Sequence, residues 1–424
     1  RCQEADGRLT PSDVPLATLD QDELDTLAAP ANIEDIMPLA PMQEGILLHS
    51  LLEQGSGIYL MQDQYAVGSE LDPEAFTQAW NRVVEDYPAL RTGFHGLESG
   101  QPHQVVYRRL PSPVSYLDLS HLDRPDAEAE LADQLALERQ QGFDLSAAPL
   151  LKVRLVRFGA ADYRIVQSHH HALVDAWCRG LMLQRFFAYY RAAIADQPLV
   201  LSTPRPYRDF VAWLGQQDAT TALSFWQERL AGISERTPLP YDQRGKSSRA
   251  MTQVDAVELA IPEAEYQACA DAARSAGVTL GTLIQAAWAL LLRRHSGHED
   301  VVFGLTVSGR PADLAGIEET VGLFINSLPF RVRSGDGLSG RDFLQQLQEE
   351  GAALRQYEHI ALADIQAAVG VSGGSLFDSL LVFENAPVDG AVFEAAERYR
   401  IRPVAHRTHT NYPLTLVVQP GTTL

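Results

Sequence analysis

The spacing of apolar and polar residues predicts strands and helices in mixed order along the chain. Strands are predicted where apolar residues alternate with polar ones or form short runs, at 58–67, 163–166, 251–261, 300–311, which ends in a turn, and 321–329. Helices are predicted where apolar residues recur every three to four positions, at 73–87, 126–141, 181–190 and 262–276.

One further helix is predicted after Thr279, whose hydroxyl suits an N-cap. The side chains expected on its buried face are Leu280, Leu283, Ile284, Ala287, Trp288 and Leu291. The order of elements in this part of the chain echoes residues 58–110. Strands and helices that alternate in two similar halves predict an α/β or α+β fold with two lobes.

Composition narrows the class of protein. A chain of 424 residues with 46% hydrophobic residues can bury a large core, and its length favours two domains or lobes. Its three cysteines (Cys2, Cys178 and Cys269) are too few for a disulfide framework, which fits a reducing cytosol. We expect no signal peptide or membrane helix. A net charge of -21 argues against nucleic acid as a partner, because its phosphates would be repelled.

Three consecutive histidines, His169, His170 and His171, stand where a predicted strand ends and a predicted helix begins, and Asp175 follows them. Such a junction turns side chains and helix amides toward one point, so these residues form a candidate site. Neighbouring residues on a strand point to opposite faces, so His170 and His171 should not both reach one ligand.

Simpler interpretations of these residues stay open. A histidine on a strand is often a core or surface residue, and Asp175 suits the N-cap of the following helix whatever else it does. His169 and His171 share a strand face and could hold a metal ion together with Asp175. No further Cys or His group lies nearby at zinc spacing, so we predict no metal site.

Residues 170–175 resemble the His-His-x-x-x-Asp signature of the condensation domains of nonribosomal peptide synthetases, within the chloramphenicol-acetyltransferase-like superfamily. Further segments resemble other motifs of the same family, in the same order and over nearly the whole chain. They are 37–49, 90–94, 205–213, 321–329, 357–365, 376–385 and 410–414.

The resemblance implies an architecture. Two chloramphenicol-acetyltransferase-like lobes would form a V-shaped pseudodimer, with a central tunnel that holds the histidine motif. We expect a linker at 1–32 with a short acidic helix, an N-terminal lobe at 33–214 and a C-terminal lobe at 215–424. The chain ends short of where family members usually end, so a last strand and helix are expected to be missing.

The resemblance also implies a reaction, in which the amine of an acceptor aminoacyl thioester attacks the carbonyl of a donor thioester. Both substrates would be carried on the phosphopantetheine of peptidyl carrier protein domains, and the domain would bind no cofactor of its own. Donor and acceptor carrier domains and neighbouring synthetase domains are therefore the expected partners. The sequence of the linker resembles the junction behind an epimerisation domain, which suggests a D-configured donor and an L-configured acceptor.

Site residues follow from the same resemblance. His171 would accept a proton or hold the amine in line, and His170, Asp175 and Ala176 would complete the catalytic loop. Arg91 would be a buried ion-pair partner of Asp175, and Trp177 and Asn326 would be structural.

Two positions depart from the family pattern. Tyr87 stands where a histidine is usual, and Ala176 stands where the family usually has glycine. An alanine would be strained at Ala176 only if the backbone there required a positive φ.

Alternative members of the superfamily fit the sequence less well. An epimerisation domain shares the histidine motif, but residues 321–326 resemble the condensation form. A heterocyclisation domain has two aspartates in place of the motif, a dual-function domain has a second histidine motif where this chain has only His49, and the Asp-Phe-Gly-Trp-Gly motif of plant acyltransferases is absent. The alternative from another class is a non-catalytic platform that recruits carrier proteins or tailoring enzymes, with which Ala176 would be compatible.

Overall fold

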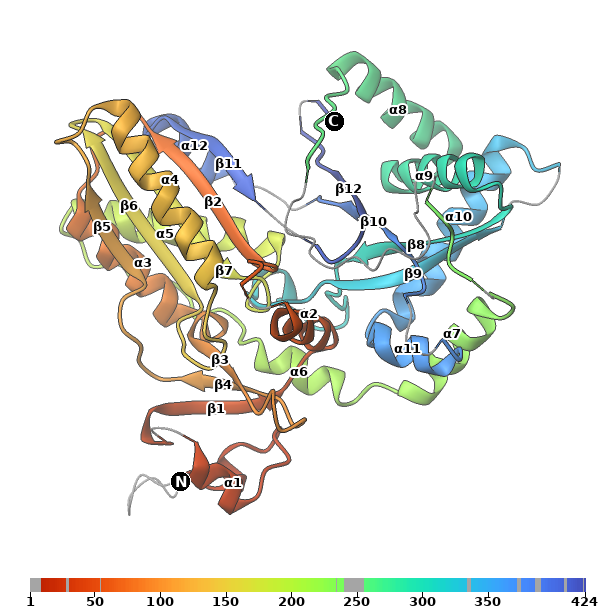
Figure 1. Cartoon of the computed structure of the whole chain (residues 1–424), viewed down its shortest axis with the longest axis horizontal. Coiled ribbons are helices and arrows are strands. Elements are labelled where there is room, and N and C mark those ends of the chain that lie inside the picture. The colour runs from red at the N-terminus through yellow and green to blue at the C-terminus, as the bar shows by residue number, and fades with distance from the viewer. Residues whose placement is uncertain are drawn as a thin grey trace. The chain divides into compact units, whose positions relative to one another are not determined.

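The computed structural model describes residues 9–27, 30–53, 55–233, 235–239, 255–333, 337–371, 375–385, 390–407, 410–421 and 423–424. The chain divides into two compact units, each built from segments that are distant in sequence (Figure 1). The first unit contains Arg1–Gln216, Arg310–Phe324 and Ala386–His409, and the second contains Gln217–Gly309, Ile325–Asn385 and Thr410–Leu424.

A five-stranded sheet is the framework of the first unit. Its order is β11 (Ile401–Arg407), β2 (Leu60–Val67), β7 (Asp162–His170), β6 (Leu151–Gly159) and β5 (Val114–Asp118), and only β5 and β6 pair in parallel. Although β11 comes late in the chain, it pairs with β2 at the edge of the sheet, and Figure 1 shows β11 in blue beside β2 in orange. The sheet therefore joins early and late parts of the sequence.

Helices cover both faces of this sheet. On α4 (Arg124–Gln141), Ala127, Leu131 and Leu135 pack against Val156 and Val166. The opposite face receives α5 (Ala176–Ile194), which packs with α3 (Pro73–Asp86) and α12 (Gly390–Arg398). Aromatic rings of α3 and α5 stack closely, with the Trp80 and Phe186 centroids 5.1 Å apart.

A smaller antiparallel sheet of β1 (Ile33–Pro38), β4 (His103–Tyr107) and β3 (Thr92–His95) completes the first unit. The N-terminal segment, with a 3-10 helix at Pro11–Asp13 and α1 (Gln21–Thr26), buries Val14 and Leu24 against Ile33, Ile36 and Val105. Asp20 caps α1, so the predicted acidic helix near the N-terminus is confirmed. The helix α2 (Pro41–Leu52) follows β1, and 3-10 helices occupy Pro30–Asn32 and Pro88–Arg91.

The segment 310–324 packs on α6 (Arg208–Leu214) and includes a 3-10 helix at Ile317–Glu319. The Phe324 ring lies 4.7 Å from the ring of Phe210 and 5.1 Å from that of Tyr207. This aromatic contact holds the segment in the first unit, although strands of the second unit precede and follow it.

The second unit is built on a sheet with the order β12 (Leu414–Val418), β10 (Ser379–Phe383), β8 (Asp300–Val307) and β9 (Asn326–Arg333). Only β8 and β9 pair antiparallel. Residues from both strands and helices form the core of this unit. Its described helices are α7 (Ala219–Leu230), α8 (Glu263–Ala276), α9 (Leu280–Ser296), α10 (Gly340–Leu354) and α11 (Leu362–Ala368), with a 3-10 helix at Arg355–Tyr357. Among the described residues, no single helix is long and apolar enough to cross a membrane.

Most predicted elements are confirmed, and the mixed α/β architecture with them. The strands at 58–67 and 163–166 correspond to β2 and β7, and the run at 300–311 contains β8, which ends at Val307. The five predicted helices correspond to α3, α4, α5, α8 and α9. The prediction at 251–261 was wrong for the described part, since 255–261 forms no strand, and 251–254 lies outside the described residues. The run at 321–329 becomes a strand only from Asn326, because residues up to Phe324 pack in the first unit.

The predicted buried face of α9 was right only in part, since Leu283, Ile284 and Trp288 pack against the core, whereas Ala287 and Leu291 are exposed. Thr279 caps the helix as expected, but the buried residues are Thr282, Ala286, Ala289 and Leu292. Leu291 is 49% exposed. The helix is apolar on nearly all sides, so its sequence pattern does not select one face, whereas small alanines allow a close approach to its neighbours.

Candidate functional site

The histidine motif lies at the junction that the sequence predicts. β7 ends at His170 and α5 begins at Ala176, so residues 171–175 form the connecting loop. Two backbone hydrogen bonds hold it: the His171 amide donates to the Tyr59 carbonyl at 2.8 Å, and the Leu173 amide donates to the His170 carbonyl at 3.0 Å. Residues 172–175 are buried, whereas His171 is half-buried.

The ring of His171 is fixed through one nitrogen. Its Nδ1 lies 3.1 Å from the carbonyl oxygen of Val174, and a carbonyl can only accept. Nδ1 must therefore carry the proton, which leaves Nε2 with a lone pair that can accept one. The Tyr59 ring packs edge-on at a centroid distance of 6.4 Å, which also limits the orientation of the imidazole.

His170 points to the other side of the strand and is buried. Its Nδ1 accepts the Ala172 amide at 3.3 Å, so its Nε2 carries the proton and donates to Ser50 Oγ at 3.1 Å. The Ser50 hydroxyl in turn donates to the Ile46 carbonyl at 2.8 Å. Burial lowers the pKa of His170 to about 3, and the neighbouring His171 and His169 act in the same direction. With both nitrogens engaged, His170 ties the motif to α2.

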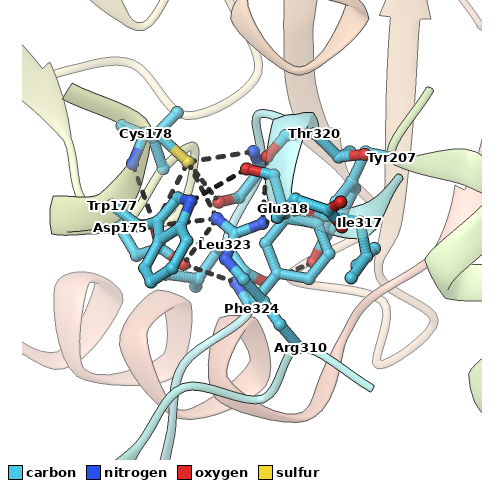
Figure 2. Close-up of polar contacts among 12 residues, drawn as sticks. Asp175, Trp177, Cys178, Tyr207, Arg310, Ile317, Glu318, Thr320, Leu323 and Phe324 are labelled. Atoms are coloured by element: carbon cyan, nitrogen blue, oxygen red, sulfur yellow. Dashed lines mark hydrogen bonds and ion pairs between the residues drawn. The ribbon is translucent and has the colours of Figure 1, made fainter. Parts of the chain in front are cut away.

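Asp175 is the N-cap of α5 and the centre of a buried polar cluster (Figure 2). Its carboxylate accepts the Cys178 amide at 3.3 Å and the Phe324 amide at 3.1 Å. Its ion-pair partner is Arg310, with Nη2 3.2 Å from Oδ1, and the two side chains are 1% and 6% exposed. The prediction that Asp175 caps the helix is confirmed.

Arg310, the first residue of the segment 310–324, has several further contacts. Its Nη1 donates to the carbonyls of Ile317 and Thr320, at 2.8 and 3.0 Å. Its guanidinium carbon lies 3.9 Å from the centre of the Phe324 ring and 5.3 Å from that of Trp177. Its charge is thus shared between one carboxylate, two carbonyls and two aromatic faces.

The pairing predicted for Arg91 was wrong. Arg91 is buried, as predicted, but its Nη1 pairs with Glu34 at 2.6 Å and its Nε donates to the Val84 carbonyl at 3.2 Å. These contacts join a 3-10 helix to β1 and α3, and Arg310 is the arginine that pairs with Asp175. Arg91 lies in a segment that resembles a family motif and Arg310 lies outside those segments, so long-range packing decides which of them reaches the carboxylate.

Cys178 and Gly322 extend the cluster. The sulfur of Cys178 lies 3.1 Å from Asp175 Oδ1 and from the Gly322 carbonyl oxygen, and burial raises the pKa of the thiol, which stays protonated. A Cβ on Gly322 would lie 2.1 Å from the Tyr207 ring, so only glycine fits there. The Tyr207 hydroxyl donates to the Leu323 carbonyl at 2.5 Å, and burial raises its pKa.

The remaining predicted residues lie as follows. Trp177 donates from Nε1 to the Glu318 carbonyl at 2.9 Å, which joins α5 to the segment 310–324. Ala176 is exposed, and it is not among the described residues with positive φ, so alanine is not strained there. Asn326 belongs to the second unit, where its amide donates to the carbonyls of Glu358 and Ile360 at 2.9 and 2.7 Å.

Sequence reasoning missed Gln43, which supports the motif from α2. Its Oε1 accepts the Ala40 amide at 2.8 Å, while its Nε2 donates to the Ala172 carbonyl at 3.0 Å and to Gln104 at 2.9 Å. Ala40 is the N-cap of α2 and Gln43 is the third residue of the helix. A glutamine at this position is a capping signal, and it could have indicated the bond to the Ala40 amide. Among the described residues, no group of three His, Cys, Asp or Glu side chains could hold a metal ion.

We predict that Asp175 couples energetically to Arg310 and not to Arg91. In a double-mutant cycle, Asp175→Asn and Arg310→Gln should be non-additive by about 1–3 kcal/mol, because each single variant leaves the other polar group buried without its partner. Asp175→Asn and Arg91→Gln, which share no contact in the structure, should add within about 0.5 kcal/mol. Urea unfolding measures both cycles. If Asp175 were coupled energetically to Arg91 and not to Arg310, the assignment of Arg310 as its ion-pair partner would be contradicted.

Stability should fall on acidification because two histidines are buried neutral. Burial lowers the pKa of His170 to about 3 and that of His169 to about 4, from 6.5. The unfolded chain therefore binds more protons below pH 6.5, and the free energy of unfolding decreases as pH falls toward 4. Glu358 acts in the opposite direction, because burial raises its pKa to about 7.

The difference between variant and wild type isolates the contribution of His170. His170→Gln should flatten the decline between pH 6.5 and 4 in urea unfolding, whereas His121→Gln, at an exposed position, should leave the slope as it is. An unchanged slope in His170→Gln would mean that His170 is not held neutral.

Comparisons with known proteins agree with one another. The family model of the Condensation domain matches residues 33–424. One of the linear gramicidin synthase proteins of Brevibacillus parabrevis is 40% identical over 421 residues, which are 99% of this chain and 5% of that protein. Tyrocidine synthase 2, from the same organism, is 33% identical over 392 residues, 92% of this chain and 11% of that protein. The chain thus spans a small part of the length of these relatives.

Two solved structures show the same fold. The first condensation domain of the calcium-dependent antibiotic synthetase superposes with a TM-score of 0.71 at 20% identity, over 91% of this chain and 87% of that one. The X-domain from teicoplanin biosynthesis gives a TM-score of 0.72 at 23% identity, over 88% and 82% of the two chains. These likenesses confirm the predicted chloramphenicol-acetyltransferase-like fold, while the predicted tunnel between the lobes stays an expectation.

Proposed function

Because the chain belongs to the condensation-domain family of nonribosomal peptide synthetases, we propose that it joins a donor aminoacyl or peptidyl thioester to the amine of an acceptor aminoacyl thioester. One observation carries the proposal of a catalytic role. The Nδ1 of His171 donates to the Val174 carbonyl, so Nε2 is the basic nitrogen of a half-buried imidazole. A half-buried imidazole with a lone pair on Nε2 is suited to accept a proton from an amine.

The proposed reaction makes modest demands on a base. The acceptor nitrogen forms a bond to the donor carbonyl carbon, the carbon–sulfur bond breaks, and the thiolate leaves. An α-amine with a pKa of about 7.7–8.0 is roughly one-tenth or more neutral near pH 7, so a nucleophile is already present. His171 accepts the proton that the attacking nitrogen loses, and holding two tethered substrates in line supplies the rest.

Asp175 serves this reaction through the backbone. The carbonyl that orients His171 belongs to Val174, the residue next to Asp175. Bonds from Cys178, Phe324 and Arg310 fix Asp175 and thereby the carbonyl before it. We assign Asp175 to positioning rather than to chemistry, and His170 likewise, because its two ring nitrogens are both occupied.

The substrates and partners follow from the family. The chain spans 5% of its linear gramicidin synthase relative, so we infer that it too works within a longer synthetase beside other domains. Donor and acceptor carrier domains would present both thioesters on phosphopantetheine. The donor residue would be D-configured and the acceptor L-configured, since the N-terminal segment resembles a junction that follows an epimerisation domain.

We predict that His171→Ala slows amide formation by about a hundredfold, at the lower end of what a positioned proton acceptor contributes. Carrier domains loaded with a donor peptidyl thioester and with a panel of acceptor aminoacyl thioesters supply the substrates, and mass spectrometry of the amide product gives the rate. His121→Ala, at an exposed position, serves as the matched control and should equal wild type.

The other outcomes are informative. Equal rates for wild type and His171→Ala would leave a domain that works by positioning alone. Binding of both loaded carriers without any amide from wild type would favour a recruitment domain instead.

The stereochemical part of the proposal predicts that wild type uses a D-configured donor at least about tenfold faster than its L-configured counterpart, a difference within reach of one shaped contact. Single-turnover rates with two donors that differ only at the α-carbon measure it. A preference for the L-donor would contradict the proposed donor stereochemistry, whereas the proposal of amide formation would still stand.

A further inference from the structure

Tyr59, the residue before β2, has a backbone conformation that a tyrosine rarely adopts. Its φ is 59°, in the left-handed region that favours glycine, and among the described residues other than glycine only Asp196 and Arg400 also have a positive φ. The Leu60 amide donates to the Gly57 carbonyl at 3.2 Å, so Tyr59 is the third residue of a tight turn. A turn with a positive φ at this position ordinarily has glycine there. The tyrosine is therefore strained.

Contacts around the turn hold Tyr59 in this conformation. The Ile58 amide donates to Ser56 Oγ at 3.1 Å. Gly57 packs against the backbone of α4, because a Cβ added to it would lie 3.1 Å from the Arg139 carbonyl oxygen. Tyr59 itself is only 5% exposed. Burial of the ring and the hydrogen bonds of the turn offset the strain, as is found where surrounding structure imposes an unfavourable backbone conformation.

Strand register brings this turn to the histidine motif. The strands β2 and β7 are antiparallel neighbours (Figure 1), and Leu60 stands opposite His170. Tyr59 therefore stands opposite His171, one position beyond the paired strands. The His171 amide donates to the Tyr59 carbonyl at 2.8 Å. The two rings lie 6.4 Å apart between centroids, with an interplanar angle of 68°. Tyr59 thus contacts His171 through both its backbone and its ring, as directly opposed residues of two strands do.

The two contacts constrain different parts of His171. The backbone hydrogen bond fixes where the residue leaves the strand. The imidazole is held by the Val174 carbonyl, 3.1 Å from Nδ1, but one hydrogen bond defines only one direction. The Tyr59 ring supplies a second contact, which limits rotation of the imidazole. Glycine in place of Tyr59 would relieve the strain and keep the backbone bond, but it would remove the ring contact.

We propose that Tyr59 is a positioning residue for His171, and that its strained turn brings the carbonyl and the ring onto His171 together. The purpose of this arrangement rests on the proposed function, in which Nε2 of His171 accepts the proton of the attacking amine. Strained residues cluster at active sites, where they preorganise the reacting groups. With Val174 on Nδ1 and Tyr59 against the ring, Nε2 is aimed in one direction before a substrate binds.

Three variants separate the ring contact from the backbone strain. Tyr59→Gly removes the ring and suits the positive φ, whereas Tyr59→Phe keeps the ring. Arg400→Gly is the matched control, because Arg400 also has a positive φ, of 51°, is exposed, and directly precedes β11 of the same sheet. Both glycine variants relieve strain, so a difference between them comes from the ring. If Tyr59→Gly does not fold in a urea titration, Tyr59→Asn replaces it, since asparagine also tolerates a positive φ.

The tautomer of His171 is a test that needs no substrate. Long-range ¹H–¹⁵N spectra of the ring nitrogens are recorded at about pH 8, where an imidazole is ordinarily neutral, and His171→Gln assigns the signals. Wild type should show a protonated Nδ1 and an unprotonated Nε2. Tyr59→Gly should show a mixture of both tautomers, while Tyr59→Phe and Arg400→Gly should resemble wild type. An unchanged tautomer in Tyr59→Gly would overturn the proposal.

The rate of amide formation shows whether this constraint serves catalysis. At saturating concentrations of loaded carrier domains, Tyr59→Gly should be about tenfold slower than wild type, a smaller loss than that of His171→Ala because the Val174 contact remains. The KM for the carriers should stay the same. Tyr59→Phe should recover the rate to within about threefold of wild type, and Arg400→Gly should equal wild type. An unchanged rate in Tyr59→Gly would overturn the catalytic purpose of the contact.

A double variant separates positioning from a general structural role. A residue that acts only through His171 has nothing left to position once the imidazole is gone. Tyr59→Gly combined with His171→Ala should therefore be as slow as His171→Ala alone, within about twofold. A further tenfold loss in the double variant would mean that Tyr59 acts independently of His171, and would overturn the proposal. If the tautomer responds as expected but wild type forms no amide, the proposed function fails and the positioning of the ring stands.

Discussion

The carboxylate of Asp175 is the constraint on which the site depends. A buried negative charge must be neutralised and hydrogen-bonded, and its partners come from α5, from Arg310 and from the backbone at Phe324. Arg310 and Phe324 both lie in the segment 310–324, so a single side chain fixes the start of a helix and a segment more than a hundred residues later. Because Val174 precedes Asp175, the same constraint fixes the carbonyl that orients His171.

Three consecutive histidines show how strand geometry divides one residue type into different roles. His170 lies on the side of α2 and is locked by Ser50 and the Ala172 amide. His169 lies on the opposite side, buried beside Asp63, while His171 has just left the strand and keeps one nitrogen available. Three identical residues therefore become a fixed buried contact at His170, a buried residue at His169 and the proposed proton acceptor at His171, because burial and hydrogen bonding differ at each position.

Local pattern was enough to predict most helices and strands, the strand-to-helix junction of the motif and the cap at Asp175, since these depend on residues close in sequence. It failed where distant residues decide. Arg91 ends a 3-10 helix and Arg310 follows β8, and only packing shows that Glu34 pairs with Arg91 and Asp175 with Arg310. The face of α9 was predicted only in part for the same reason. Gly322, inside an apolar run, carried a usable signal, because a glycine there indicates close approach of another group, here the Tyr207 ring.

The way in which His171 is held differs from the arrangement in a catalytic triad. In a Ser-His-Asp triad a carboxylate accepts the Nδ1 proton and stabilises the imidazolium, whereas here a neutral backbone carbonyl accepts it. The carbonyl fixes the tautomer and orientation as well as a carboxylate would, but it adds no negative charge to favour protonation. In the proposed reaction this arrangement would be sufficient, because an amine nucleophile needs a proton removed during attack rather than activation beforehand. In the proposed reaction, most of the acceleration would then come from the alignment of two tethered substrates.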